Sequence, residues 1–237
     1  VKAINGLGAE VVSLEEIENS VHFGKDRDAA MAHLVAALNA EAGARTWAYV
    51  PSPTDVPSPE REDVIRNGFI YQHDVVVPQG ESVIYDGPEF DNARDPLAQV
   101  FKPKAGNAAD KFILVVNHFK SKGSACKGEA EGPQGNCNET RVAQAQGLVE
   151  FADRMKDETD VAKVYLDGDF NSYTHEDPMQ VLHDAGYTNL HVLHETEASY
   201  LFDGLVGSLD HALANDAALG TTTGATVWTI NAYESVA

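Results

Sequence analysis

The sequence predicts an α+β fold in which two packed β-sheets are flanked by helices. Short apolar runs typical of strands outnumber the helical patterns, and only two long segments have helical spacing, 28–42 and 140–156. No repeat of fixed period occurs, and no low-complexity linker divides the 237 residues. We therefore expect a single domain over 1–237 with mixed strands, and not a strictly alternating parallel sheet.

The first half is expected to begin with a buried strand over 10–14. A helix over 28–42 follows, because Met31, Leu34 and Leu38 recur on one face and Gly43 ends it. The segment 51–60 holds four prolines and is predicted to be an exposed loop. Short strands are predicted around it, at 47–50, 68–71 and 75–77.

The second half contains the clearest strand of the chain, KFILVVNH at 111–118, preceded by one at 97–101. The helix over 140–156 places Leu148, Ala152 and Met155 on a buried face. The remaining predicted strands are 164–169, 209–214 and 226–230.

Acidic residues dominate the charge of the chain. It has 37 Asp and Glu against 17 Lys and Arg, a net charge of −20, with 43% hydrophobic residues, which excludes a disordered chain. Such a surface repels phosphate backbones and anionic lipid, so nucleic-acid affinity has to come from a local site or bound cations. It also suits high salt, and no apolar run is long enough to span a bilayer.

Polar residues follow several apolar strands at their carboxyl ends. The four strand ends are LEE at 14–16, VNH at 116–118, LDGDFN at 166–171 and LDH at 209–211. Each alone is compatible with a turn former, a helix cap or a structural histidine. Together they indicate a cleft whose oxygen ligands favour Mg²⁺ or Ca²⁺ over zinc. This composition fits metal-assisted hydrolysis in which a histidine activates water.

The two cysteines, Cys126 and Cys137, lie in a Gly-rich stretch that lacks a neighbouring histidine. A zinc site is not expected, because its usual four ligands are absent. A disulfide and two free thiols both fit the spacing. We expect the disulfide, which favours an oxidising compartment and hence secretion.

Seven segments of this chain resemble, in order, the endonuclease/exonuclease/phosphatase superfamily, whose best-known member is deoxyribonuclease I. The resemblance is greatest to its bacterial extracellular nucleases of the ExeM/NucH type. The segments are GAEVVSLEEIEN at 8–19, GFIY at 68–71, RDPLAQVF at 94–101, VNHFKSKGS at 116–124, GNCNETR at 135–141, GDFNSY at 168–173 and LDHAL at 209–213. The resemblance implies a four-layer α/β/β/α sandwich that includes nearly the whole chain.

The resemblance also implies roles for individual residues. Glu16 and Asp169 are similar to metal-binding acids, with Asp169 also orienting the attacking water; Glu15 is expected to point to the opposite face. His118 is similar to a general acid that contacts the scissile phosphate. The remaining catalytic and substrate-binding candidates are Asn171, Asp210, His211, Arg94, Asn117 and Arg141. Among these, Asn171 and Arg94 are expected to hold phosphate oxygens.

Two departures from the family pattern shape our expectations. The chain begins after the point where the superfamily has a first strand with a metal-binding Asn, so we expect that strand to be missing and the chain to be a piece of a longer protein. No Ser-Asp-His follows LDHAL, and the chain ends instead near Trp228 and Asn231. His211 therefore either turns into the cleft to replace the missing imidazole, which we favour, or is buried behind the sheet.

The resemblance implies a secreted or cell-surface bacterial nuclease that hydrolyses DNA or RNA and acts as a monomer. Mg²⁺ is the expected cofactor, with Mn²⁺ and Ca²⁺ as alternatives. The first alternative function is a phosphodiesterase or phosphatase on small or lipid phosphates, since fold does not determine substrate. The second is an inactive acidic binding module.

Overall fold

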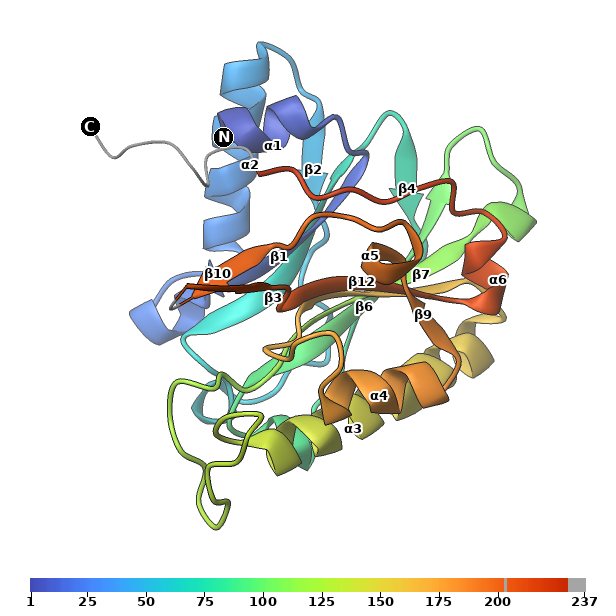
Figure 1. Ribbon diagram of the computed structural model, residues 1–237. Helices are drawn as coiled ribbons and strands as arrows, with labels where there is room; N and C mark the ends of the chain where they lie inside the picture. The colour runs from blue at the N-terminus through green and yellow to red at the C-terminus, as the bar shows by residue number, and fades with distance from the viewer. Residues whose placement is uncertain (203, 230–237) are drawn as a thin grey trace.

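The computed structural model describes residues 1–202 and 204–229 (Figure 1). Its largest sheet has the strand order β4-β6-β7-β8-β12-β9, with β5 also paired to β6. The bounds of these strands are β4 Val76–Pro78, β5 Val83–Ile84, β6 Arg94–Pro103, β7 Phe112–His118, β8 Val164–Asp169, β9 Tyr187–Asn189 and β12 Asp210–Asn215.

A smaller antiparallel sheet has the order β1-β3-β2, formed by Val11–Glu18, Ile65–Gln72 and Trp47–Tyr49. A separate two-stranded ribbon consists of β10 Tyr200–Phe202 and β11 Leu205–Gly207. The helices are α1 Lys2–Leu7, α2 Ala29–Ala42, α3 Asn138–Thr159, α4 Asp177–Asp184, α5 Leu190–Leu193 and α6 Asp216–Leu219. Short 3₁₀ helices lie at Ser20–Phe23, Pro59–Arg61, Pro88–Phe90 and Ala108–Asp110.

Three hydrophobic clusters separate four layers, which confirms the predicted sandwich. Met31 and Leu38 of α2 pack on the small sheet, and Phe69 and Phe101 fill the space between the two sheets. The helices α3 and α4 cover the other face of the large sheet (Figure 1), where Leu148 and its neighbours are buried. The apolar faces predicted for both long helices are therefore the faces that pack.

The centre of the large sheet determines where the polar strand ends meet. Strands β7 and β8 are parallel, so His118 lies opposite Asp169, and antiparallel β12 places Asp210 opposite Asp169 on the other side. Gly168 allows this approach: its φ is +134°, and a Cβ there would lie 2.0 Å from the carbonyl oxygen of Asn117. A side chain at 168 would force these two strands apart.

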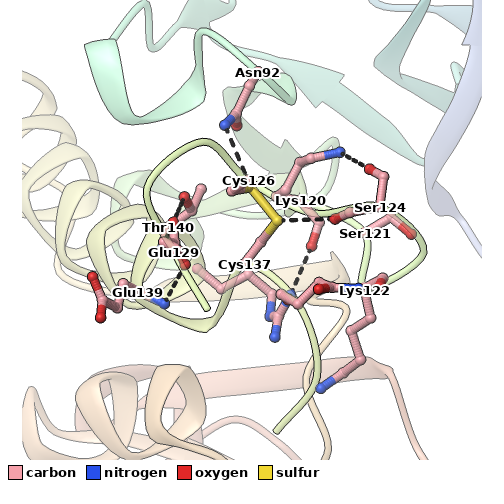
Figure 2. Close-up of a disulfide and its surroundings, with 12 residues drawn as sticks. Asn92, Lys120, Ser121, Lys122, Ser124, Cys126, Glu129, Cys137, Glu139 and Thr140 are labelled. Atoms are coloured by element: carbon pink, nitrogen blue, oxygen red, sulfur yellow. Dashed lines mark hydrogen bonds between the residues drawn. A yellow bond between two sulfur atoms is a disulfide. The ribbon is translucent and has the colours of Figure 1, made fainter. Parts of the chain in front are cut away.

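The predicted disulfide is confirmed. Cys126 and Cys137 are joined, with 5.2 Å between their Cα atoms, and they close the loop that precedes α3 (Figure 2). Within this loop, the Glu129 carboxylate accepts backbone N–H groups of Glu139 and Thr140 at 3.0 and 3.1 Å. A loop side chain therefore caps the first turn of α3.

Other predicted elements differ from the structure. The strand predicted for 226–230 is wrong over 226–229, where the backbone is irregular, because the edge of β12 is already paired to β9. Ile230 lies outside the described residues. The short helices α1 and α4 and the β10–β11 ribbon were not among the predicted elements. No helix in the described part of the chain is long and apolar enough to cross a membrane.

Candidate active site

His118, Asp169 and Asp210 end or begin three adjacent strands and form the centre of the candidate site. His118 is buried, and its Nε2 lies 3.4 Å from Asp169 Oδ2. Asp210 is exposed and accepts a hydrogen bond from Ser199 Oγ at 2.9 Å. Paired residues on neighbouring strands point to the same face, so all three side chains face the small sheet.

Asn171 is held beside this centre by an unusual backbone conformation. Its φ is +46°, in the left-handed region that an Asn tolerates better than most residues. The Asn171 backbone N–H donates to Asp169 Oδ1 at 2.7 Å, and its amide donates to the Phe119 carbonyl at 3.1 Å. The sequence-predicted residues His118, Asp169, Asn171 and Asp210 are therefore together.

Arg94 lies at the rim of this group and is nearly buried. Its Nη2 donates to the Phe119 carbonyl at 2.7 Å, and its Nη1 lies 3.8 Å from the Asp63 carboxylate. Burial lowers the pKa of Arg94, opposed by the carboxylates of Asp63, Asp169 and Glu16. The guanidinium nevertheless remains charged at neutral pH, because its ordinary pKa is so high. It thus places a positive charge at the edge of an acidic group.

The expectation that Glu15 points away from Glu16 is wrong. Strand β1 slips by one residue against β3 between Leu14 and Ile17, and Glu16 has a φ of +57°. A bulge of this kind breaks the alternation of side chains along a strand. Both glutamates therefore lie near the site. Glu15 is close to the carboxylates of Asp167 and Asp210, and Glu16 is close to Asp169 and Arg94.

Burial and mutual repulsion raise the pKa values of these carboxyl groups. Burial, followed by Asp167 and Asp210, raises the pKa of Glu15 to about 8. Burial raises the pKa of Asp167 to about 7, and burial together with Asp210 raises that of Asp169 to about 6. Carboxylates held this close favour a proton or a cation between them.

His118 is neutral at pH 7. Burial, and then the positive charge of Arg94, lower its pKa to about 3, and these effects outweigh the nearby Asp169 carboxylate. The 3.4 Å contact is therefore a close approach of a neutral imidazole to a carboxylate and not a salt bridge. Within the described residues, His118 Nδ1 and Asp167 Oδ1 are buried without a hydrogen-bond partner.

The donor set fits a magnesium-like ion better than zinc. The clustered ligands are carboxylate oxygens, and no described cysteine is free. Among residues 1–202 and 204–229, no three His, Cys, Asp or Glu side chains converge closely enough to enclose a metal by themselves. Magnesium commonly needs only one or two carboxylates, with water and substrate phosphate completing its shell. Glu16 and Asp169 match that pattern in number and type.

Asn117, Arg141 and His211 are predicted site residues that lie away from this centre. Asn117 faces the helices, is fully buried and donates to the Asp167 carbonyl at 2.9 Å. Arg141 is fully buried in α3, where its guanidinium donates to the carbonyls of Asn136 and Gln134. Neither side chain can reach a phosphate as positioned, because each is committed to backbone carbonyls on the far side of the sheet.

His211 occupies the second of its two expected positions and is buried behind the sheet. Its Nε2 donates to the Ser172 carbonyl at 2.8 Å, so its Nδ1 is free to accept from the Asn189 amide at 3.0 Å. Burial lowers its pKa to about 4. The favoured expectation, an imidazole turned into the cleft, is contrary to this placement, because alternation along β12 directs His211 opposite to Asp210.

Sequence reasoning missed three acids near the site: Glu15, Asp167 and Asp63. The spacing of Asp167 and Asp169 around Gly168 is itself a signal, since residues two apart on a strand share a face. Glu15 had no such signal, because only the bulge directs it to the site. Asp63 lies in an irregular segment before β3, and nothing in the sequence pairs it with Arg94.

The fold is that of endonuclease/exonuclease/phosphatase proteins. One similar structure is a protein of that family from Bacteroides thetaiotaomicron, with a TM-score of 0.59 and 11% identity, covering 90% of this chain and 70% of that chain. A mannosyl-6-phosphatase from the same organism has a TM-score of 0.58 and 11% identity over 91% and 74%. TDP2 from D. rerio, complexed with a single-strand DNA product, has a TM-score of 0.55 and 16% identity over 90% and 74%.

These likenesses confirm the fold that the resemblance to this superfamily implies. No protein-family model and no curated protein sequence matches the chain. The ExeM/NucH type stays a prediction.

Proposed function

We propose that this chain, with the fold of phosphoester-hydrolysing proteins, is a divalent-metal-dependent nuclease acting on DNA or RNA. The observation that carries the proposal is the meeting of His118, Asp169 and Asn171 beside Arg94, whose guanidinium shares the Phe119 carbonyl with the Asn171 amide. In this group Arg94 is a cation near which a phosphate could lie, and Asp169 and His118 are groups that could accept a proton from water. The group lies at strand ends, where a rigid backbone orients the side chains.

The protonation states support attack by water on a phosphodiester. At pH 7 Asp169 is mostly ionised, since its pKa is about 6, and His118 is neutral. Asp169 would orient the attacking water, and the imidazole would receive a proton or hydrogen-bond to the scissile phosphate. The general-acid role predicted for His118 needs a protonated imidazole, which the negative charge of a bound phosphate would favour. Arg94 and Asn171 would hold the phosphate oxygens.

Glu16 and Asp169 would hold the metal, and a bound cation would favour the ionised forms of the nearby Glu15 and Asp167. Bound Mg²⁺, or Mn²⁺ or Ca²⁺ in its place, supplies a Lewis acid that neutralises charge on the phosphate. The raised pKa values of the acids support this assignment, because a cation would relieve their repulsion.

A phosphatase or phosphodiesterase on small phosphates is the second candidate, since the fold is shared with a mannosyl-6-phosphatase. Lys120, two residues after His118, favours the nuclease, because a longer polyanion gains from an additional cation. The Lys122 ammonium is already paired with Glu176. An inactive acidic module is a third candidate. It is disfavoured by the buried, unpartnered His118 Nδ1 among the described residues, which has no structural use as positioned.

The test is incubation of the chain with supercoiled plasmid and Mg²⁺, with and without a chelator. Nicked circles that disappear with chelator support the proposal, and the Asp157→Asn variant, altered on the exposed face of α3, should nick equally well. Intact plasmid together with release of phosphate from a small monoester would support the phosphatase. No hydrolysis of either substrate would favour the inactive module.

We also propose secretion from a bacterial cell and action as a monomer. The disulfide supports an oxidising compartment, and the charge of −20 supports solubility without self-association.

A further inference from the structure

The β10–β11 ribbon exposes more apolar surface than any other described element. Leu201, Phe202, Leu205 and Val206 are between 62% and 74% exposed, and Tyr200 is 37% exposed. The ribbon pairs with no other strand in the described chain. Neighbouring exposed side chains on the two paired strands lie side by side, so each face of the ribbon carries a contiguous apolar strip. Contiguous apolar surface of this kind commonly marks an interaction site.

The two faces of the ribbon differ in chemistry. Tyr200 pairs with Gly207 and Phe202 with Leu205, so these residues share one face, whereas Leu201 and Val206 share the other. The rings of Tyr200 and Phe202 are parallel within 9°, with centroids 6.2 Å apart. We call the face that carries these two rings the aromatic face. Two parallel, exposed rings can each receive another planar ring by stacking.

The aromatic face is continuous with the candidate active site. Tyr173 lies two residues after Asn171, and its ring packs against the aromatic face at Gly207. A Cβ added at Gly207 would lie 2.6 Å from the Tyr173 ring. The Lys122 Nζ lies 5.4 Å from the centroid of the same ring. At this same end of the ribbon, next to the Tyr200–Gly207 pair, the Ser199 hydroxyl donates to the Asp210 carboxylate. A strand whose phosphate lies at Arg94 and Asn171 would therefore pass close to this face.

An open groove of about 550 Å³ lies at the base of the ribbon. Its lining includes Tyr173, His175 and Glu176 together with Val206, Gly207 and Ser208. The groove lies beside the rings of Tyr200 and Phe202 without including them. A groove of this volume has ample room for a nucleobase, and its walls combine apolar and polar groups.

The charge of the region indicates the occupant. No lysine or arginine occurs between 195 and 215, and the whole chain carries −20, so anionic lipid and phosphate are repelled here. Attraction to this face has to be uncharged, and stacking of bases on aromatic rings is such an attraction. The bases of a duplex are already stacked on one another, so only an unpaired strand offers them freely.

We infer that the aromatic face, with Tyr173 beside it, stacks the bases of a single-stranded nucleic acid next to the scissile phosphate. This inference rests on the proposed function and narrows its substrate to unpaired DNA or RNA. It assigns affinity for the base to Tyr200 and Phe202, and contact with the phosphate to Arg94 and Asn171.

The test compares two labelled oligonucleotides of equal charge by fluorescence anisotropy, with EDTA present to prevent cleavage. One is an oligothymidylate of about twelve nucleotides, and the other has the same length but lacks bases. We expect the wild type to bind the first at least about fivefold more tightly. The variant Tyr200→Ala/Phe202→Ala should bind both equally, whereas Leu201→Ala, on the opposite face, should keep the preference.

Several results would overturn the inference. Equal binding of both oligonucleotides by the wild type would do so, as would a preference that survives in the double variant. So would loss, in that variant, of binding to phosphatidylcholine vesicles or of a wild-type dimer seen by light scattering, since the aromatic face would then serve lipid or a second copy. Circular dichroism melting verifies that the variants fold.

Cleavage of bis-p-nitrophenyl phosphate by the wild type with Mg²⁺ separates this inference from the proposed function, because that diester has no base. If neither it nor DNA is cleaved, the proposed function fails. If DNA is cleaved but removal of both rings leaves the base preference intact, only the inference fails.

Discussion

At the scale of single residues, the site holds carboxyl groups that repel one another and an imidazole whose pKa differs from its ordinary value in water. Asp169 is linked by hydrogen bonds to Asn171 and lies against a neutral His118, while Glu15 and Asp167 lie nearby with raised pKa values. Burying several acids close together lowers the stability of the fold, so such an arrangement is expected to persist where function requires it. Clusters of perturbed acids and a perturbed imidazole are therefore evidence for chemistry at this location.

The first prediction concerns Asp169. Replacing it with Ala removes the carboxylate that orients water, so turnover should fall by about 10²–10⁴-fold. The fold should persist, because the lost group is a repelled, partly buried acid. Plasmid nicking and thermal melting measure the two effects, with Asp157→Asn as the matched loss of a carboxylate. A variant that keeps more than about a third of the wild-type rate would refute the assignment.

The second prediction concerns His211. Replacing it with Asn shortens the side chain, so it cannot reach both the Ser172 carbonyl and the Asn189 amide. We expect the free energy of unfolding to fall by about 1–3 kcal/mol, with turnover within a few-fold of wild type. Urea denaturation checks the first and plasmid nicking the second, with exposed His183→Asn as control. A tenfold or greater loss of turnover at unchanged stability would restore His211 to the catalytic group.

The third prediction concerns Asp95, whose pKa is raised to about 7, foremost by burial and then by Asp86 and Glu62. The folded chain therefore binds this proton more tightly than the unfolded chain, whose carboxyl has its ordinary pKa near 3.8. Its effect on stability becomes increasingly unfavourable as pH rises from about 4 to about 7, and is constant above. Asp95→Asn should thus be more stable than wild type at pH 8, and this advantage should disappear toward pH 4. A gain that is the same at both pH values would contradict the prediction.

Most of the candidate site could be predicted from the sequence, because His118, Asp169, Asn171 and Asp210 lie at or just after strand ends. Arg141 and Asn117 were misassigned for a physical reason. A basic or amide side chain beside a motif can serve a phosphate or a backbone carbonyl equally well, and only the burial of the fold decides between them.

At the scale of elements, long periodic segments were predictable and short ones were not. The helix α2 and the strand β7 have patterns that extend over many residues. In contrast, α1 buries no residue and β10 is exposed throughout, so neither has an apolar periodicity to detect. The bulge in β1 depends on pairing with β3 and leaves no mark in the sequence.

The fourth prediction concerns the loop closed by Cys126 and Cys137. Its disulfide should contribute about 2–3 kcal/mol by limiting the unfolded chain. Opening it would also loosen the cap that Glu129 forms on α3 (Figure 2). The Asn136 carbonyl that accepts from Arg141 would loosen as well. Urea denaturation with and without a phosphine reductant measures the loss, and the Cys126→Ser/Cys137→Ser variant should not respond to reductant. Two thiols that react with an alkylating agent in the native, unreduced chain would disprove the bond.

At the scale of the whole molecule, the net charge of −20 means that most of the surface and the few cationic positions act on a polyanion in opposite ways. The bulk of the surface repels a polyanion, so binding of a nucleic acid would depend on a few cations, such as Arg94 and Lys120, and on uncharged contacts such as those proposed for the aromatic face. Composition predicted the repulsion, but only the fold shows which cations face the site. The acidic residues elsewhere on the surface affect the stability of the fold together, because they repel one another.

The fifth prediction is that salt stabilises the chain. Self-repulsion among the acidic groups disfavours the compact state, and added ions screen it. The free energy of unfolding should rise as NaCl increases from about 0.05 M, with most of the gain complete by about 0.5 M, where screening already acts over only a few ångströms. Urea denaturation at fixed pH, repeated in NaCl and in KCl, should give the same curve, because screening depends on ionic strength and not on the cation. A gain that continues in proportion to concentration above this range would instead indicate exclusion of salt from the surface. A chain that is less stable in salt would show that its attractive ion pairs, such as Arg66–Asp28, outweigh the repulsion.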